Sequence, residues 1–581
     1  MDGTHLSRLC VLAGLACFLQ HASAQVTTRV SSDTRGIEGN GTSGAFASGG
    51  LWGPAITPEG RWIAYESLAS NLVALDTNAV RDVFVHDRQT GVCERVSVDS
   101  LGFEGNGASS VPAISLDARY VAFESLSTNL VLADGNSRRD IFVRDRQLGT
   151  TERVNVSNSG SEGNNDSFLP TISGDGRYVV FYSLASNLVA GDAGGFRDVF
   201  IRDLQLGTTA LVSVSDASAQ GNANSFDPRL SLDGRHVAFS SIATNLVTGD
   251  VNGMRDIFLR DLVAGTTELI SVSSAGLQGD FESDHASISG YGRYVAFQSG
   301  AKNLVPGDTN DSRDVFVRDR SLSLTVRVSL SSAGAQTNFW SYFPSISADG
   351  NLVAFDSNSG GLVGGDTNTV RDVFLHDRST ATTTRLSLNS AGAQGTKTST
   401  LPAISADGAF VAFETASPGF APGDVNTLAD IFVRSLGLSC TAMATYCTAK
   451  VNSLGCTPSI GASGAPFLSG PDAFRITAVN VLSAKPGLLL WSNASAAQPF
   501  MGGTLCLAAP IKRMGGQASI DAGLTLACTG TYSFAFDQSY AASQGLVPGQ
   551  TLFAQIWSRD PGFVAPASVG LTNALQLTIC Q

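Results

Sequence analysis

The chain has 581 residues, too many for one ordinary domain, so we expect at least two domains. Hydrophobic residues make up 43% of the chain and charged residues only 15%, which excludes a largely disordered protein. A formal net charge of −13 argues against a nucleic-acid partner, because the phosphates would be repelled. The 62 glycines, set against 19 prolines, indicate many tight turns and favour an all-β chain.

The N-terminus has the features of a secretory signal peptide. Arg8 precedes an apolar run over residues 9–19, and residues 22–24 (Ala-Ser-Ala) form a cleavage site. We therefore expect a mature chain from Gln25 and a bacterial protein that is secreted, held at the cell surface or periplasmic. In the alternative lipoprotein interpretation Cys17 would carry the lipid, but the triplet before it, Gly-Leu-Ala, matches poorly. No later stretch is long and apolar enough for a membrane helix.

An aspartate-rich loop recurs with a constant period of 58 residues, and its fifth copy reads DTNDSRD (308–314). The first aspartate of the loop is found at Asp76, Asp134, Asp192, Asp250, Asp308, Asp366 and Asp424. The last aspartate is found at Asp82, Asp140, Asp198, Asp256, Asp314, Asp372 and Asp430. Seven copies at one unbroken step indicate a repeat architecture.

Each repeat contains four strand-like segments, which in the third copy are residues 170–173, 177–183, 197–203 and 209–215. These segments are rich in aromatic and β-branched residues and are separated by turns. Four antiparallel strands in each of seven repeats predict a seven-bladed β-propeller over residues 25–436. The seventh repeat lacks its fourth strand, and residues 26–32 match the missing segment. We therefore expect the N-terminal strand to close the last blade, which would remove free sheet edges.

The repeat also resembles a known family. The turn Ser-x-Asp-Gly-Arg (173–177 and 231–235), with Tyr-Val-Ala-Phe (294–297) and residues 313–320, is similar to the repeat of TolB-type, WD-repeat-like β-propellers. The resemblance covers roughly residues 25–436, about 70% of the chain. It implies a propeller fold but no specific function, since this repeat serves scaffolds, sensors and enzyme-gating domains alike. TolB resembles a six-bladed propeller with an N-terminal companion domain, whereas this sequence predicts seven blades and no such domain. We therefore infer no binding partner from the resemblance.

The aspartate loops have two interpretations. Ca²⁺ prefers about six to eight oxygen ligands, and the spacing Asp-x-Asn-x-x-x-Asp offers two carboxylates and one amide oxygen per loop. The candidate ligands are Asp76, Asn78, Asp82, Asp308, Asn310, Asp314, Asp366, Asn368 and Asp372. Alternatively, Asp and Asn accept backbone N–H bonds at hairpin loops, which would make these loops structural turns. We favour structural turns, because a binding site usually breaks the symmetry of a repeat.

A ligand site is expected where the repeats differ, and the loops before the fifth and sixth repeats differ most. The candidate residues are Asp280, Glu282, Asp284, His285, Trp340 and Tyr342. In an extended segment the three acids would point to the same side, beside the densest aromatic cluster of the chain (338–343). Acids beside an aromatic platform suit a sugar or a cationic ligand. The alternative is that the aromatic residues belong to the core and the acids are solvated.

The repeat ends near residue 437, and the composition changes. Strand-like runs over residues 487–493, 531–537 and 551–560 predict a β-sandwich over residues 437–581. Six cysteines of this segment predict three stabilising disulfides with undetermined pairing: Cys440, Cys447, Cys456, Cys506, Cys528 and Cys580. Cys93 is left over as a free thiol. Residues 446–456 resemble a C-terminal module of secreted bacterial proteins, which implies no residue roles.

We expect a monomeric, non-enzymatic binding module or surface scaffold for a protein or carbohydrate ligand. No catalytic residue is assigned, and Ca²⁺ is the one ion considered. One alternative is an extracellular glycan-active enzyme that uses Asp280, Glu282 and Asp284. Another is a calcium-dependent adhesion module in which the aspartate loops matter most. A propeller-gated peptidase is disfavoured, because residues 461–465 lack the final glycine of the Gly-x-Ser-x-Gly motif.

Overall fold

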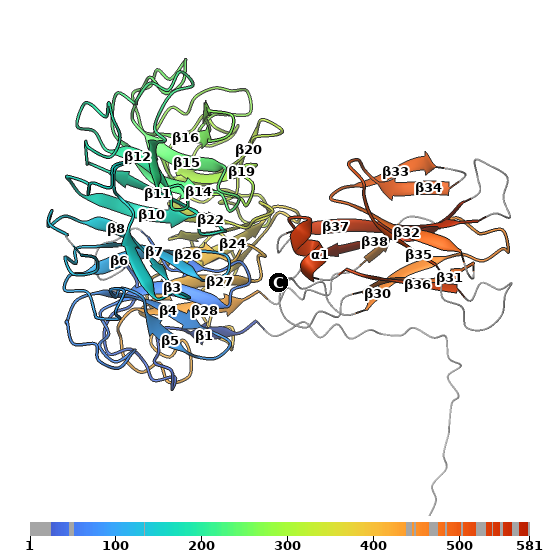
Figure 1. The fold of residues 1–581 in the computed structure, drawn as a ribbon, viewed down its shortest axis with the longest axis horizontal. Coiled ribbons are helices and arrows are strands. Elements are labelled where there is room, and N and C mark those ends of the chain that lie inside the picture. Colours follow the sequence, from blue (N-terminus) through green and yellow to red (C-terminus); the bar gives the residue numbers. More distant parts are fainter. Residues whose placement is uncertain are drawn as a thin grey trace, which may run out of the picture.

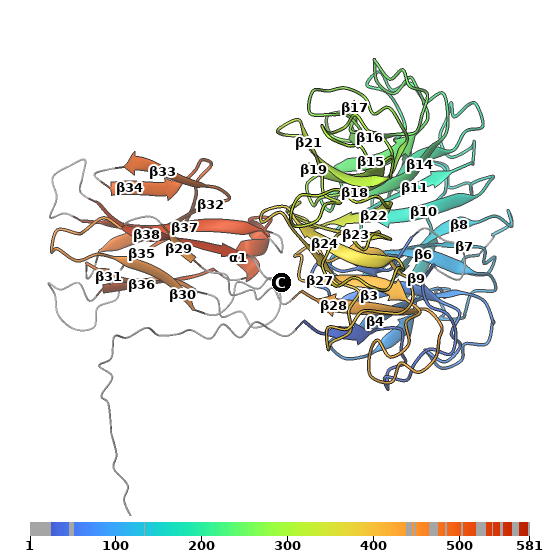
Figure 2. The same ribbon diagram turned by 180° about the vertical axis from the view of Figure 1, so that it is seen from behind.

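The computed structural model describes residues 25–45, 52–132, 134–436, 444–446, 449–463, 475–482, 485–500, 503–518, 530–536, 538–546, 550–560 and 569–578. A large lobe consists of four-stranded antiparallel sheets set around a common axis, as in a β-propeller, and a smaller lobe follows it (Figure 1, Figure 2). The predicted signal peptide lies outside the described residues. Among those residues no helix has the length and apolarity needed to cross a membrane.

Seven four-stranded sheets follow one another along the large lobe, and we number them in chain order. Sheet 1 consists of β2 (Ala55–Ile56), β3 (Trp62–Ser67), β4 (Asp82–Asp87) and β5 (Cys93–Arg95). Sheet 2 consists of β6 (Ser109–Ile114), β7 (Tyr120–Ser125), β8 (Asp140–Asp145) and β9 (Thr150–Arg153). Sheet 3 consists of β10 (Ser167–Ile172), β11 (Tyr178–Ser183), β12 (Asp198–Asp203) and β13 (Thr208–Leu211). Sheet 4 consists of β14 (Ser225–Leu230), β15 (His236–Ser241), β16 (Asp256–Asp261) and β17 (Thr266–Leu269).

The remaining sheets of this lobe repeat the pattern, and the last one borrows a strand. Sheet 5 consists of β18 (Ser283–Ile288), β19 (Tyr294–Ser299), β20 (Asp314–Asp319) and β21 (Leu324–Arg327). Sheet 6 consists of β22 (Ser341–Ile346), β23 (Leu352–Ser357), β24 (Asp372–Asp377) and β25 (Thr382–Arg385). Sheet 7 consists of β26 (Ser399–Ile404), β27 (Phe410–Thr415), β28 (Asp430–Ser435) and β1 (Thr27–Arg29). The predicted pairing of the N-terminal strand with the last repeat is thus confirmed.

The strands of the third repeat are found close to where the sequence predicts them, with two differences. The first, predicted over residues 170–173, spans Ser167–Ile172. The fourth, predicted over residues 209–215, ends at Leu211. It ends early because the chain turns into a tight hairpin, in which Val214 bridges to Gln220.

Each sheet buries one stacked aromatic pair between its two central strands. Phe123 of β7 is the cross-strand partner of Phe142 in β8, and their ring centroids are 5.9 Å apart. The equivalent pairs are Tyr65–Phe84, Phe181–Phe200, Phe239–Phe258, Phe297–Phe316, Phe355–Phe374 and Phe413–Phe432. Nearly every residue of β7 and β8 is buried, including the polar residues at their ends.

The innermost strands are tied to the preceding sheet at a β-bulge. In β6 the register shifts between Ser110 and Ala113, and Val111 has a φ of 50°, which is strained for a β-branched residue. Its amide donates a hydrogen bond of 2.9 Å to Glu66 of sheet 1, which offsets the strain. Equivalent bonds join Leu169 to Glu124, Phe343 to Gln298 and Leu401 to Asp356. The bulge therefore recurs where the inner strand faces the propeller axis.

The outer strands are tied together by buried hydroxyl groups. Thr151 of β9 donates a hydrogen bond of 2.6 Å to the carbonyl of Val98, which follows sheet 1. Thr27 of β1 makes the same bond, also of 2.6 Å, to the carbonyl of Leu388. The N-terminal strand therefore reproduces the link between sheets that the other repeats make within one continuous chain. In sheet 1 the equivalent residue is Cys93, which is buried and free, as the sequence predicts.

The smaller lobe contains ten described strands in three sheets and one short helix. Its elements are β29 (Ala444–Tyr446), β30 (Ser459–Ser463), β31 (Arg475–Val481), β32 (Pro486–Ser492), β33 (Ser495–Phe500), β34 (Gly503–Leu507), β35 (Lys512–Ala518), β36 (Gly530–Ala535), α1 (Gln538–Ser543), β37 (Thr551–Arg559) and β38 (Val569–Thr578). A five-stranded sheet (β29-β38-β37-β32-β35) and a three-stranded sheet (β30-β31-β36) share one apolar cluster that includes Trp491 and Tyr532. The three strand predictions made for this segment are confirmed, and helix α1 was not predicted.

The cysteines of the smaller lobe are only partly described. Cys456 and Cys506 are disulfide-bonded. Cys440, Cys447, Cys528 and Cys580 lie outside the described residues. The number and pairing of the predicted disulfides therefore stay a prediction.

The clasp formed by β1 can be tested with two neighbouring threonines. Thr27→Ala removes a buried hydroxyl that donates to Leu388 and accepts from Arg434, so we expect a loss of about 1–3 kcal/mol of unfolding free energy. Thr28→Ala is the matched control, because the Thr28 hydroxyl makes only one long contact of 3.4 Å. Urea unfolding measures both variants. Equal midpoints for the two variants would contradict docking of β1.

Candidate functional site

The three acids predicted for a ligand site do not form one cluster, because each has its own contacts within the protein. Asp284 is only 4% exposed, and Arg313 donates two hydrogen bonds of 2.8 and 2.9 Å to its carboxylate. Glu282 lies 3.4 Å from the same guanidinium, whereas Asp280 accepts a hydrogen bond from the amide of Lys302. Burial raises the pKa of Asp284, but contacts with His285 and Arg313 outweigh it and hold the pKa well below the ordinary value.

The predicted aromatic residues begin a chain of contacts that runs from the surface into the channel. Trp340 is 54% exposed and lies 5.9 Å from Tyr342, measured between ring centroids. Tyr342 lies 5.9 Å from Phe343, and Phe343 lies 4.9 Å from His285. The ring of His285 then stacks on Trp52 at 5.0 Å. The structure thus brings His285, Trp340 and Tyr342 into one continuous surface.

His285 occupies the strained bulge position of β18. Its φ is 50°, and its side chain is only 7% exposed. Nδ1 lies 3.2 Å from a carboxylate oxygen of Asp284, while Nε2 has no hydrogen-bond partner among the described residues. The imidazole lines a cavity on the propeller axis, so its free nitrogen is a candidate ligand contact.

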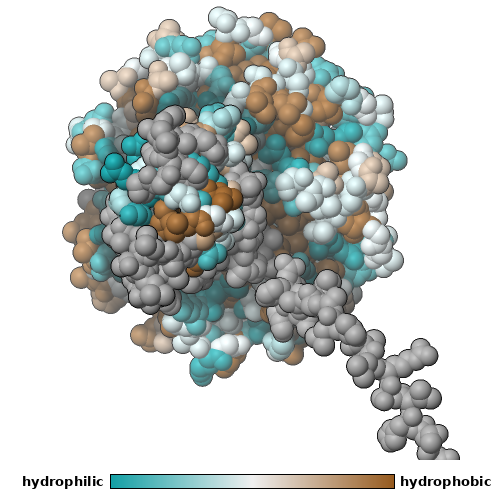
Figure 3. All heavy atoms as spheres, turned by 90° about the vertical axis from the view of Figure 1, so that its right-hand side faces the viewer, coloured by the Kyte–Doolittle hydropathy of each residue, from teal (hydrophilic) through white to brown (hydrophobic). Residues whose placement is uncertain are grey.

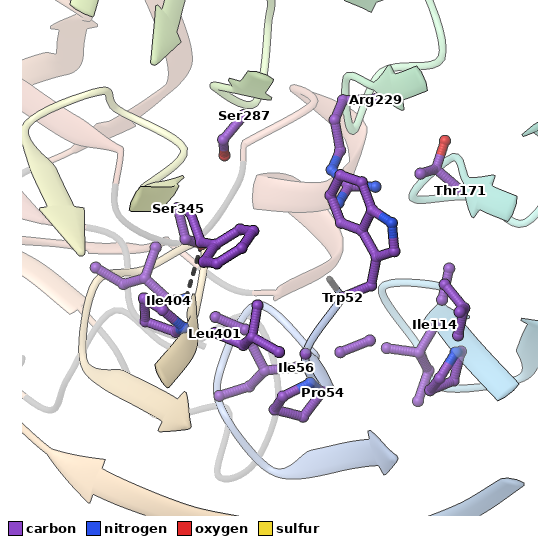
Figure 4. Close-up of a pocket in the computed structure, with 18 of the residues that line it drawn as sticks. Trp52, Pro54, Ile56, Ile114, Thr171, Arg229, Ser287, Ser345, Leu401 and Ile404 are labelled. Carbon is purple, nitrogen blue, oxygen red and sulfur yellow. Dashed lines mark hydrogen bonds between the residues drawn. The ribbon is translucent and has the colours of Figure 1, made fainter. Parts of the chain in front are cut away.

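The axial cavity has a volume of about 290 Å³ and is lined by the inner strands of all seven sheets. One lining position repeats every 58 residues as Ala55, Ala113, Thr171, Arg229, Ser287, Ser345 and Ala403. Arg229 is the only large and charged side chain in this ring. Its guanidinium carbon lies 3.9 Å from the ring centroid of Trp52, and the two side chains lie against each other in Figure 4.

Arg229 and Trp52 were not among the site residues predicted from the sequence, although each could have been found from a departure from the repeat. Arg229 stands out once the inner-strand positions are aligned at the 58-residue period. Trp52 lies within an insertion, because Asn40 precedes its counterpart Asn106 by 66 residues instead of 58. Both residues mark places where the repeat is broken.

A guanidinium lies between the paired carboxylates of most aspartate loops. In sheet 1, Nη1 of Arg95 lies 3.2 Å from Asp76, 3.4 Å from Asp82 and 2.8 Å from Glu104. Asn78 donates a hydrogen bond of 2.8 Å to Asp82 and does not turn its oxygen toward it. Arg153, Arg327 and Arg385 are placed in the same way in sheets 2, 5 and 6. Asp308, Asp314, Asp366 and Asp372 are thus ion-paired, and Asn310 and Asn368 repeat the contact of Asn78.

In sheets 3 and 4 a glutamine, and not an arginine, donates hydrogen bonds to the two carboxylates of the aspartate loop. Leu269 of sheet 4 replaces the arginine, and the amide nitrogen of Gln278 donates 2.7 Å and 2.9 Å hydrogen bonds to Asp250 and Asp256. Gln220 does the same for sheet 3. The predicted Ca²⁺ ligands are therefore in contact with donors of the protein itself, and the calcium prediction itself stays untested.

Sheet 7 differs from the other copies because its arginine comes from β1. Glu38, Asp424 and Asp430 form the one group of described acidic oxygens, all within 4.8 Å of one another, whose spacing would suit a metal ion. Arg29 lies 3.2 Å from Glu38 and 4.0 Å from Asp424. One oxygen of Asp430 has no hydrogen-bond partner among the described residues. None of these residues belongs to the predicted calcium set.

Burial makes the paired aspartates weaker acids. Burial and the neighbouring charge of Asp82 raise the pKa of Asp76 to about 6, against the opposing effect of Arg95. Burial likewise raises the pKa of Asp430 to about 7, against its contacts with Ser31 and Arg29. The donors beside these loops therefore oppose protonation of the aspartates.

An arginine exchange in two sheets tests this account of the loops. Arg95→Leu leaves Asp76, Asp82 and Glu104 facing one another, so we expect a loss of about 3–5 kcal/mol at pH 7. Arg327→Leu should cost only about 1 kcal/mol, because Gln336 can donate to Asp308 and Asp314 as Gln278 does in sheet 4. Adding Glu104→Gln to Arg95→Leu should restore most of the stability. Urea unfolding that shows equal losses and no rescue would overturn the account.

The pH dependence of stability tests the aspartate loop of sheet 7, which receives its arginine from β1. The folded protein binds a proton at Asp430 between the ordinary pKa of 3.8 and about 7, so its contribution to stability falls as pH rises through this window. Asp430→Asn removes the charge, and we expect it to be more stable than the parent above pH 7, by on the order of 1–4 kcal/mol, with no gain near pH 4. Asp280→Asn, at an exposed loop, is the control. An unchanged pH profile in Asp430→Asn would show that Asp430 does not titrate in this window.

Together the sheets and the axial cavity define a β-propeller protein with an asymmetric channel. No protein family model and no curated protein matches the sequence. Among solved structures, the chain is similar to an oligogalacturonate lyase from Vibrio parahaemolyticus, with 13% identity over 71% of this chain and 93% of that one, at a TM-score of 0.44. It is similar to TolB from Acinetobacter baumannii, with 17% identity over 53% of this chain and 59% of that one, at a TM-score of 0.31. It is also similar to the propeller domain of the Trilobed protease from Pyrococcus furiosus, with 10% identity over 65% of this chain and 93% of that one, at a TM-score of 0.42. These likenesses assign neither an activity nor a ligand.

Proposed function

We propose that the chain is an extracytoplasmic binding protein whose residues 25–436 form a closed propeller of seven blades. Its ligand, a carbohydrate or a protein, binds at the channel mouth between sheets 5 and 6. The observation that carries this proposal is the chain of ring contacts that starts at half-exposed Trp340 and ends at Trp52. It passes through Tyr342, Phe343 and His285. Phe281 and Phe339 of the same two loops are also half-exposed, which gives the mouth an apolar platform.

A binding role fits the acids better than glycoside hydrolysis does. A general acid must carry a proton near neutral pH, whereas Arg313 and His285 keep Asp284 ionised. Asp284 is also buried, and Glu282 shares the guanidinium of Arg313. These pairs hold the two loops in place and support an architectural role for the acids.

The aspartate loops are structural in this proposal. The guanidinium of Arg95, Arg153, Arg327 or Arg385 occupies the place between carboxylates that a cation would take. Gln220 and Gln278 serve the two sheets without such an arginine. This arrangement supports turns fixed by the protein over calcium-dependent adhesion.

A described contact joins the smaller lobe to the end of sheet 5 that lies away from the channel mouth. Tyr291, in the turn between the first two strands of sheet 5, donates a hydrogen bond of 3.4 Å to the carbonyl of Gly545. This turn lies at the opposite end of the strands from Trp340. Seen from the side of the smaller lobe, the surface mixes hydrophilic and hydrophobic residues (Figure 3). We propose that residues 437–581 form a separate, disulfide-stapled β-sandwich domain that presents the propeller with its mouth outward.

The mouth is tested by removing its exposed indole. On a panel of immobilised glycans, Trp340→Ala should weaken binding of the best glycan about 10-fold or more, since buried aromatic anchors dominate such contacts. Leu132→Ala is the matched control, because Leu132 is 97% exposed in a loop at the same end of sheet 2. Because the proposed protein binds glycans without hydrolysing them, no new reducing ends should form when the parent protein is incubated with the glycans. Equal binding by the two variants, or cleavage lost in Glu282→Gln, would contradict the proposal.

A further inference from the structure

The axial cavity is positively charged within a strongly acidic protein. Among the described lining residues, Arg229 is the only one that always carries a charge, and none is an acid. The whole chain has a formal net charge of −13. The cavity is thus an exception to the charge of the molecule around it, and it favours a negatively charged occupant.

The guanidinium of Arg229 has most of its hydrogen-bonding capacity unused. Its one hydrogen bond goes to the carbonyl of Pro228 at 3.3 Å, and no described residue forms an ion pair with it. Burial lowers the pKa of Arg229 to about 10, against the opposing effect of the nearby charge of Asp227, so the group stays charged at neutral pH. An unpaired charge away from bulk water is costly unless a partner supplies the missing bonds.

Two further polar atoms at the cavity lack partners. Nε2 of His285 and Oγ1 of Thr171 are buried without a hydrogen bond to any described residue. The equivalent hydroxyl groups of Ser287 and Ser345 are satisfied by the amides of Ile346 and Ile404. Figure 4 shows Thr171 and Ser287 on opposite sides of Arg229 and Trp52. Among the described lining residues, the two unsatisfied groups therefore come from sheets 3 and 5, on either side of Arg229 in sheet 4.

The walls determine what kind of anion fits. Prolines and aliphatic residues of sheets 1, 2, 3 and 7 form one side, and Trp52 lies against the guanidinium. One guanidinium can hold one carboxylate through two parallel hydrogen bonds, while an apolar wall and an indole favour a ring or hydrocarbon body. A dianion such as phosphate would lack a second cation. The volume of about 290 Å³ admits only a small molecule.

We propose that the axial cavity binds a small organic carboxylate, held by Arg229 and packed against Trp52, with His285 and Thr171 as further hydrogen-bond partners. This inference rests on the proposed binding function, because the cavity continues the aromatic surface of the mouth. The carboxylate comes either from an aromatic acid or from a sugar acid.

The test compares matched acids and neutral molecules on the mature chain by calorimetry. Benzoate and glucuronate are the carboxylate probes, and benzamide and glucose are their neutral counterparts. We expect at least one acid to bind about 10-fold or more tightly than its neutral counterpart, since bonds to charged groups contribute most. Whichever acid binds identifies the source of the carboxylate.

Arg229→Ala should abolish this preference, and Arg229→Lys should weaken binding of the acid, since lysine cannot hold a carboxylate through a planar fork. Alanine is the residue at three equivalent positions, so Arg229→Ala should fold, which a thermal midpoint no lower than that of the parent confirms. Arg235→Ala is the charge-matched control, because Arg235, in the turn between β14 and β15 of the same repeat, pairs with Asp261 and does not line the cavity.

Three results would overturn the carboxylate assignment: equal binding of acids and neutral molecules, unchanged binding by Arg229→Ala, or no binding of either acid at millimolar concentration. If a neutral glycan still binds in a Trp340-dependent way, the binding function stands and only the carboxylate assignment fails. If no ligand binds at either place, both proposals fail.

Discussion

Two buried carboxylates that face each other need a donor between them, and six of the seven sheets of the large lobe meet this requirement at one loop. The second aspartate of every loop is almost completely buried, so repulsion there is little screened by water. Arginine, or glutamine where arginine is missing, supplies the donor and ties the loop to the following connection. The geometry of each repeat is thereby fixed locally. The bulge amides and the outer threonines then join one repeat to the next.

Because each repeat is held together by these contacts, the inner-strand side chains that face the propeller axis are not needed for its structure. The inner strands are held by their ladders and by bonds such as Glu124 to Leu169, so the side chains that face the axis can vary. They do vary: one ring position holds alanine, serine or threonine in six sheets and Arg229 in the other. A symmetric frame with an asymmetric lining is how a repeat protein acquires a specific site.

The sequence predicted the frame well, because equal local sequence at equal spacing gives equal local structure. The 58-residue period indicated the sheets, and residues 26–32 indicated the strand that pairs with β28. The site was harder to predict. Asp284 was taken for a ligand group, but its partner Arg313 comes from a loop 29 residues later, and no pattern links the two. Arg229 was overlooked because a single arginine is significant only against its six small equivalents.

The central claim is that the protein, and not a bound ion, completes the aspartate loops. The most direct measurement is a crystal structure of the mature protein grown with calcium, with anomalous scattering used to locate the ions. The account predicts guanidinium density between Asp76 and Asp82 and between Asp308 and Asp314, with no anomalous peak at either loop. A peak with oxygen ligands at about 2.3–2.6 Å and a displaced Arg95 or Arg327 would contradict it.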